Sequence, residues 1–347
     1  MRSHSRQSVL MRALLCCLLA VTAFARGAKS PTPSLPSAVT PLRLVRPAQY
    51  TGMCDASGAV TVNSNLFIVA DDEDNILRVY RADQPRGPVK QFDFNGFLEV
   101  HGKSLEADLE GAARIGDRAF WIGSHGRNKN GKERLNRHRL FATDIHEKDG
   151  DVSLIPVGIP YKRLLDDLLL DARFHEFHFE EAARHAPKEA GALNIEGLSA
   201  TPDGHLLIGF RSPVPAGKAL LIPLLNPNEV MEGKSGNFGS AVQLDLGGLG
   251  IRDIAWHQGT YLIIAGSSDG GHQFQLYRWT GPGKKPERLP VNHLNRYQPE
   301  ALVIYPQLGL QEFQVLSDDG TFLIDGCPCK ELKDPNRKTF RSFWVAP

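Results

Sequence analysis

Four acidic residues at matching positions along the chain could together hold a metal ion. They are Glu110, Glu196, Asp253 and Glu300, and each opens a β-rich segment. Carboxylates that converge in a channel repel one another unless a base or a cation neutralises them. Hard oxygen ligands suit Ca²⁺ or another divalent cation better than Zn²⁺, and no His/Cys cluster has zinc spacing. The alternative is that each acid caps a turn or pairs with a neighbouring arginine.

A basic segment over residues 123–139 could bind an anion. It holds six Arg or Lys side chains against one acid, Glu133. Arginines with backbone amides commonly hold phosphate, sulfate or carboxylate. The predicted anion ligands are Arg134, Arg137, Arg139 and Arg211. His125 is a candidate general base, and Arg127 would polarise the bound anion. The alternatives are a solvated loop, arginines that neutralise the acids, and a histidine that only forms hydrogen bonds.

These acids belong to a sequence pattern that recurs along the chain. In each copy an acid or small residue precedes three small or apolar residues, a turn, and a β-rich run that ends in a small residue. The two ends are 13 positions apart at residues 110–123, 196–209 and 253–266. Further copies start at Ser57 and Glu300. Four-stranded units of about 50 residues in series are typical of a β-propeller, and a β-sandwich is the alternative.

The sequence therefore predicts an all-β fold, a β-propeller of five or six four-stranded blades. Third strands are expected at residues 76–80, 138–142, 219–224, 274–279 and 321–324. Fourth strands are expected at residues 89–94, 152–157, 241–246 and 287–290. Because successive strands of a blade run antiparallel, the loop entering each first strand and the loop following each second strand reach the same face. The candidate metal ligands should therefore ring one mouth of the central channel.

A helical insertion is expected at about residues 161–190, between the second and third blades. Leucines recur there at helical spacing, and charged residues supply a polar face. The insertion enters just before Glu196, so it should overhang the same mouth. Its simplest role is a packing cap.

The N-terminal segment has the features of a secretory signal peptide. Residues 1–25 combine basic residues, a short apolar run and an A-x-A cleavage site at residues 23–25. The alternative, a membrane anchor, would need a longer apolar run. Residues 26–41 are rich in Pro, Ser and Ala and suggest a flexible lead-in. Residues 42–347 should form a single propeller domain in a secreted or periplasmic protein without a membrane span.

Three cysteines follow the predicted cleavage site: Cys54, Cys327 and Cys329. An oxidising compartment permits a disulfide. A bond from Cys54 to either of the other two would tie the ends of the domain together, and a local Cys327–Cys329 bond is the alternative. A redox or metal-binding pair is less well supported, because one Cys-x-Cys without suitably spaced histidines is weak evidence.

The overall composition is that of an ordinary globular protein. Hydrophobic residues make up 41% and charged residues 23% of the 347 residues, and the formal net charge is +1. Whole-chain disorder and a basic nucleic-acid-binding tail are excluded by these values. We expect a monomer that binds a small anionic molecule and no nucleic acid.

Four segments together resemble a known family. They are residues 109–112 (LEGA), 121–127 (WIGSHGR), 136–141 (NRHRLF) and 193–198 (LNIEGL). They resemble the domain-of-unknown-function 3616 family of secreted bacterial proteins over about residues 50–325. That resemblance implies the propeller fold and secretion but no particular chemistry.

More distantly, the Glu-Gly motif looks like that of the esterase-like phytase and gluconolactonase-type propellers. In those proteins channel acids bind Ca²⁺ or another divalent ion. Glu110 and Glu196 match the motif, Glu300 is followed by Ala301 instead of Gly, and Asp253 departs further.

Two functions fit these observations. The first is a metal-assisted hydrolase of an anionic ester, phosphoester or lactone, with Glu110, Glu196 and Glu300 around the ion. The second is a non-catalytic periplasmic propeller that uses the same mouth to bind a ligand or a protein.

Overall fold

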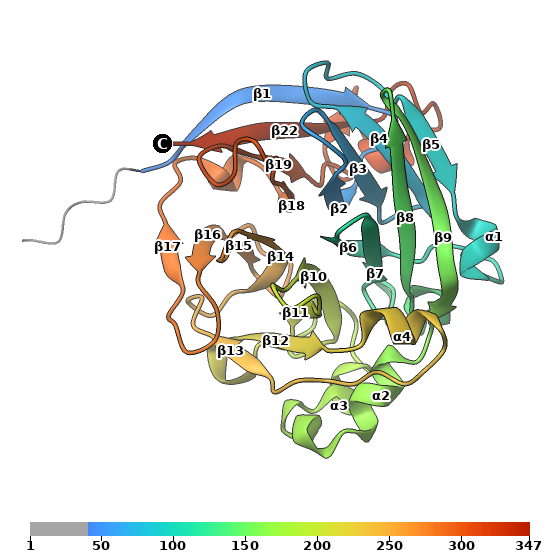
Figure 1. The fold of residues 1–347 in the computed structure, drawn as a ribbon, viewed down its shortest axis with the longest axis vertical. Helices are drawn as coiled ribbons and strands as arrows, with labels where there is room; N and C mark the ends of the chain where they lie inside the picture. The colour runs from blue at the N-terminus through green and yellow to red at the C-terminus, as the bar shows by residue number, and fades with distance from the viewer. Residues whose placement is uncertain (1–40) are drawn as a thin grey trace, which may run out of the picture. The chain divides into compact units, whose positions relative to one another are not determined.

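The computed structural model describes residues 41–347, which contain five four-stranded antiparallel sheets arranged as the blades of a β-propeller (Figure 1). The predicted signal peptide and nearly all of the predicted lead-in lie outside the described residues. The first strands of the blades contact one another in a closed ring, because β2, β6, β10, β14 and β18 each touch the next. The structure therefore has five blades, and its first strands surround the channel.

Blades 1 to 4 are each built from consecutive strands. Blade 1 consists of β2 (Ala56–Thr61), β3 (Leu66–Asp71), β4 (Ile76–Arg81) and β5 (Lys90–Asp93). Blade 2 consists of β6 (Leu109–Ile115), β7 (Arg118–Gly123), β8 (Leu140–Lys148) and β9 (Asp151–Tyr161). Blade 3 consists of β10 (Asn194–Ala200), β11 (Leu206–Ser212), β12 (Ala219–Leu224) and β13 (Val242–Leu244). Blade 4 consists of β14 (Gly250–His257), β15 (Thr260–Gly266), β16 (Phe274–Trp279) and β17 (Glu287–Leu289).

Blade 5 joins the two ends of the domain. Its inner strands are β18 (Pro299–Val303) and β19 (Phe313–Ser317), its third strand is β22 (Thr339–Ala346), and its outer strand is β1 (Arg43–Thr51). The predicted third strand at residues 321–324 is wrong. That region forms a small hairpin of β20 (Leu323–Ile324) and β21 (Cys327–Pro328), and it leaves Phe322 exposed. β22 takes the blade position instead, because its alternate residues bury Phe343 and Val345 in the core.

The hydrophobic core is divided into five clusters, one between each pair of neighbouring blades. β7 shows how one strand serves two clusters. Phe120 and Ile122 pack toward blade 3, while Ala119 and Trp121 pack toward blade 1. Both faces of a blade are thus buried, which explains why the inner strands are nearly continuous apolar runs rather than alternating ones.

The predicted helical insertion is confirmed as a group of short helices. These are α2 (Leu164–Leu170), a 3₁₀ segment (Ala172–Phe177) and α3 (Phe179–Ala182), and their apolar side chains join the core between blades 2 and 3. The other short helices are α1 (Asn95–Leu98) and α4 (Pro227–Met231), with single 3₁₀ turns at Leu135–Arg137, Pro215–Gly217, Leu294–Arg296 and Cys329–Glu331. Among the described residues, no helix is long and apolar enough to cross a membrane.

A disulfide joins Cys54 to Cys329 across 275 positions of sequence, and Cys327 is a free thiol. Of the pairings left open by the sequence, this is one of the two that tie the ends of the domain together. Cys54 lies just before blade 1, and Cys329 opens the 3₁₀ turn that follows β21 in the connection to β22 of blade 5. Since disulfides persist in oxidising compartments, the bond fits an extracellular location.

Candidate functional site

The first strand of every blade carries a β-bulge at the same end of the channel. In β6, Leu109 pairs with Gly123 and Gly111 with Ile122, so Glu110 is left without a partner between them. A register shift occurs in the other first strands too. The unpaired residues are Glu196 in β10, Arg252 in β14 and Glu300 in β18, whereas β2 leaves the uncharged Ser57 and Gly58 unpaired. A bulge re-aims a side chain out of the pleat. The bulges therefore bring three carboxylates and one guanidinium to one mouth, on the face predicted from strand alternation.

The glycine after two of these glutamates has a packing reason. A Cβ atom at Gly111 would lie 2.7 Å from the carbonyl oxygen of Glu196 in the next first strand. A Cβ atom at Gly197 would lie 2.7 Å from a methyl group of Ile251 in β14. The Glu-Gly motif thus combines a bulge residue with the close approach of neighbouring first strands around the channel.

Asp253 lies one residue beyond the bulge of its blade. Its carboxylate accepts hydrogen bonds of 2.7 Å from the backbone N–H groups of Ile254 and Leu302, which tie blade 4 to blade 5. Burial raises the pKa of Asp253 to about 8. The structure brings Glu110, Glu196 and Glu300 together, with one oxygen of each within 4.8 Å of the others, and Asp253 is not among them.

Arg252 neutralises two of the three converging glutamates. Its Nε atom lies 3.0 Å from Oε2 of Glu196 and 3.1 Å from Oε2 of Glu300. Arg211 adds a second ion pair to Glu196, at 2.8 Å. Burial raises the pKa of Glu300 to about 8 and the Arg252 charge opposes that rise. The group formed by Glu196, Arg252 and Glu300 is therefore already largely compensated.

Glu110 differs from its two neighbours in having no partner. Its side chain makes no hydrogen bond or ion pair with any described residue, although the residue is only 8% exposed. One of its oxygens lies within 4.8 Å of carboxylate oxygens of Asp72 and Asp108. Oδ1 of Asp72 is also buried without a hydrogen-bond partner. Burial and the neighbouring carboxylates raise the pKa of both Glu110 and Asp72 well above their usual values.

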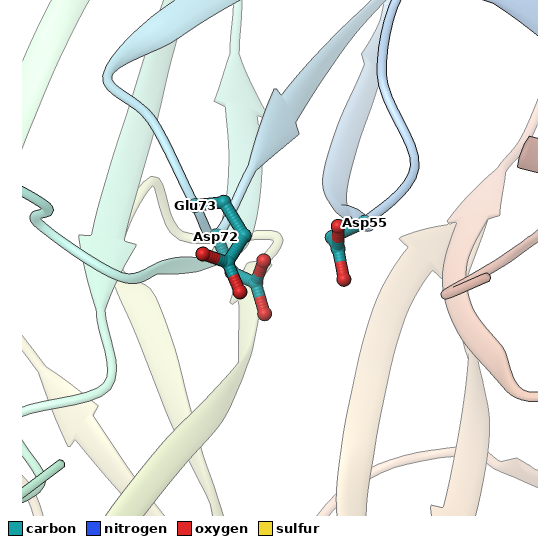
Figure 2. A group of neighbouring side chains, drawn as sticks. All are labelled: Asp55, Asp72 and Glu73. Carbon is teal, nitrogen blue, oxygen red and sulfur yellow. The ribbon is translucent and has the colours of Figure 1, made fainter. Parts of the chain in front are cut away.

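Asp108 and Asp72 come from the loops that meet at this mouth. Asp108 immediately precedes β6, and Nη1 of Arg137 donates to it at 2.7 Å while the same guanidinium also pairs with Glu106. Asp72 directly follows β3. Asp72 also belongs to a second acidic group with Asp55 and Glu73 (Figure 2). Glu73 pairs with Lys330 at 2.6 Å.

In the basic segment at residues 123–139, most arginine side chains donate hydrogen bonds to backbone carbonyl oxygens. Arg127 donates from Nε to the carbonyl of Ala183, at 2.7 Å, so it fastens the segment to the helical insertion. Arg139 is buried and donates to the carbonyls of residues 98, 99, 135 and 138. Arg134 is half-buried. Of the predicted anion ligands, only Arg137 and Arg211 pair with acids of the mouth within the described part of the chain.

His125 is buried beside this segment. Nδ1 lies 2.9 Å from the carbonyl oxygen of Gly123, and the ring stacks on His138 at a centroid distance of 5.3 Å. Nε2 has no partner among the described residues. Burial, together with the neighbouring His138, lowers the pKa of His125 to about 3, so the ring is neutral at physiological pH. No carboxylate of the mouth bonds to it in the described structure.

The metal-free mouth should make the folded protein less stable as pH rises. Burial raises the folded-state pKa of Asp55 to about 9 and that of Asp108 to about 7, whereas an unfolded Asp titrates near 3.9. The folded state thus holds more protons than the unfolded state above about pH 4, and stability falls as pH rises through the folded values. We expect urea unfolding in the presence of a chelator to give a free energy lower by at least about 1.4 kcal/mol at pH 8.5 than at pH 5.5. A free energy that is constant or rises over this interval would contradict the placement of these buried carboxyls.

The fold and site define a five-bladed propeller with an acidic channel mouth, and a family match agrees with this class. The chain belongs to the family described as protein of unknown function (DUF3616), which it matches over residues 55–157 and 158–303. No match was found among the curated proteins.

Solved structures show only a similarity of fold. Glutaminyl cyclase from Myxococcus xanthus is 14% identical, with a TM-score of 0.43 and coverage of 88% of this chain and 97% of that one. A gluconolactonase from Xanthomonas campestris is 12% identical, with a TM-score of 0.40 and coverage of 84% and 83%. The aldose sugar dehydrogenase of Streptomyces coelicolor is 12% identical, with a TM-score of 0.40 and coverage of 86% and 99%. Similarities at this level carry no argument about activity.

Proposed function

We propose that this protein is a secreted hydrolase of an anionic ester, phosphoester or lactone, and that it depends on a divalent cation such as Ca²⁺ at the channel mouth. Asp72, Asp108 and Glu110 would hold the cation. The observation that carries the proposal is the Glu110 carboxylate, which is buried without a partner beside two other carboxylates. An unpaired carboxylate is costly to bury, and a cation would remove that cost.

The remaining charged residues support this arrangement. Arg137 fixes the Asp108 carboxylate, while Arg211 and Arg252 hold Glu196 and Glu300 on the other side of the mouth. Glu196 and Glu300 then shape the site without being needed as ligands, because their charges are already compensated. A bound divalent cation would polarise an ester or phosphoryl oxygen and make water more acidic. We propose that His125 and Arg127 keep the adjacent segment in shape, since both are engaged with backbone carbonyls.

The secreted location is part of the proposal. The signal-peptide pattern over residues 1–25 suggests export, and the Cys54–Cys329 disulfide supports an oxidising environment.

Substituting Glu110 by Gln should abolish cation binding with little change in shape. At a Ca²⁺ concentration of 100 times Kd, wild-type protein should gain about 2.7 kcal/mol in free energy of unfolding, and E110Q should gain close to none. Urea unfolding with Ca²⁺ and with a chelator measures this difference. Glu176→Gln is a matched control, because Glu176 is exposed on the helical insertion, and it should respond as wild type does.

The activity is tested on the same three proteins. Phosphoesters, carboxylic esters and lactones are incubated with and without Ca²⁺, and hydrolysis by wild type and E176Q but not by E110Q is expected. If wild-type protein contains no metal, is not stabilised by divalent ions and hydrolyses none of these compounds, the proposal fails.

The alternative is a non-catalytic propeller that binds a ligand at the same mouth. The buried, neutral His125 favours it, because the general base expected from the sequence contacts no acid of the described site. Stabilisation by Ca²⁺ without any hydrolysis would support this alternative.

A further inference from the structure

We propose that the mouth holds a second divalent cation, bound by Asp55, Asp72 and Glu73, so that Asp72 bridges two ions. The inference rests on the proposed cation at Asp72, Asp108 and Glu110 and extends it to a pair. One carboxylate oxygen from each of Asp55, Asp72 and Glu73 lies within 4.8 Å of the others. Both acidic groups contain Asp72, and a carboxylate has two oxygens with which to serve two ions.

The environment of Asp55 indicates that this group of acids binds a ligand and is not a chance cluster. The residue is only 3% exposed, and its side chain has no hydrogen bond or ion pair with any described residue. It directly precedes β2, and Figure 2 shows its carboxylate across from Asp72 and Glu73. A buried carboxylate without a partner is unfavourable unless a cation neutralises it.

The chain leaves room for this carboxylate by placing a glycine beside it. A Cβ atom at Gly320 would lie 1.6 Å from Oδ1 of Asp55, so any other residue there would displace the carboxylate. The backbone of Asp55 is held by an antiparallel bridge to Asp318. The disulfide at Cys54 fixes the preceding residue. The backbone of Asp55 is thus held by the bridge and the disulfide, and its carboxylate packs against Gly320.

The local charge balance favours a second cation. Five carboxylates belong to the two groups: Asp55, Asp72, Glu73, Asp108 and Glu110. The cationic side chains that bond to them are Lys330, which pairs with Glu73, and Arg137, which pairs with Asp108. When all five carboxylates are ionised, these two cations and one divalent ion together still leave one negative charge at the mouth. Lys330 bonds only Oε1 of Glu73, so the other oxygen is free to reach an ion.

The pair can be detected with Mn²⁺, which binds oxygen ligands and is paramagnetic. We expect equilibrium dialysis of wild-type protein to give two Mn²⁺ per chain, with an electron paramagnetic resonance spectrum of two coupled ions. Asp55→Asn should reduce the stoichiometry from two to one and give the six-line spectrum of an isolated ion. Asp203→Asn, in an exposed turn, is the matched control and should keep two.

The outcomes separate this inference from the proposed function. One uncoupled Mn²⁺ in both wild type and D55N overturns the second site and leaves the first intact. No bound Mn²⁺ in wild type overturns both. Glu73→Gln is a second variant, because this exposed side chain can be changed without disturbing the core. This variant should lower the affinity for the second Mn²⁺ by at least 10-fold and leave the affinity for the first unchanged. An unchanged affinity for the second Mn²⁺ would also contradict the proposed bridging by Asp72.

Discussion

Replacing Arg252 by Met should destabilise the protein by about 3–5 kcal/mol, the cost of removing one partner from a buried ion pair. Arg252 contacts Glu196 and Glu300, and all three residues are buried. Without the guanidinium, Glu300 keeps no ion-pair partner among the described residues, and Glu196 keeps only Arg211. The free energy of unfolding in urea at pH 8, with a chelator present, measures the loss.

The origin of this loss can be tested by removing the uncompensated charges. The double variant R252M and E300Q should recover most of the stability, because Glu196 keeps its ion pair with Arg211 and residue 300 no longer carries a charge. Arg134→Met is the matched control. Arg134 is half-buried and its side chain bonds only the carbonyl of Glu133, so its change should stay within about 0.5 kcal/mol. If R252M alone were as stable as wild type, the three side chains would not form the buried group described above.

The propeller could be predicted because its blades repeat in sequence. The spacing from Glu110 to Gly123 and from Glu196 to Gly209 spans one first strand, a tight turn and one second strand, and it reflects the paired geometry of those strands. Blade 5 breaks the rule, because its third strand lies after a small hairpin and its outer strand comes from the N-terminal end of the domain. Strand pairing between distant parts of the chain leaves no local sequence pattern. The short apolar run at residues 321–324, the first one after β19, therefore resembles the third strand of blade 5 in sequence although β22 takes that place.

The site was predictable only in part, because a bulge shifts the register by one residue. Aligning the repeats on their acids selects Asp253, whereas the pairing of β14 with β15 places Arg252 at the bulge. A carboxylate and a guanidinium carry opposite charges. An alignment shifted by one residue therefore changes the predicted charge at the mouth.

The ligands missed by the sequence reasoning lie in loops. Asp72 and Asp108 flank strands of different blades, and nothing in their spacing relates them until the blades are set side by side. Strand alternation predicts that the loop after each second strand reaches this face, and Asp72 lies in such a loop after β3. Asp55 could not be distinguished from a solvated loop acid, because its lack of a partner is a property of the packed mouth.

Removing the disulfide should lower the free energy of unfolding by about 2–5 kcal/mol. Cys54→Ala together with Cys329→Ala opens a covalent loop that spans 275 sequence positions, and long loops constrain the unfolded chain most. Blades 1 and 5 would still be joined through β1, which pairs with β22 along its length, so the variant should fold. Urea unfolding under oxidising conditions measures the loss.

Cys327→Ala is the control for this loss, because Cys327 is a free thiol two residues from Cys329. It should unfold as wild type does under the same conditions. If the double variant lost no stability, β1 and β22 alone would close the propeller. The disulfide residues also flank Asp55 and Lys330 in sequence, so the double variant should bind divalent cations more weakly than C327A does. Such a coupling would show that the bond closing the propeller also positions the acidic mouth.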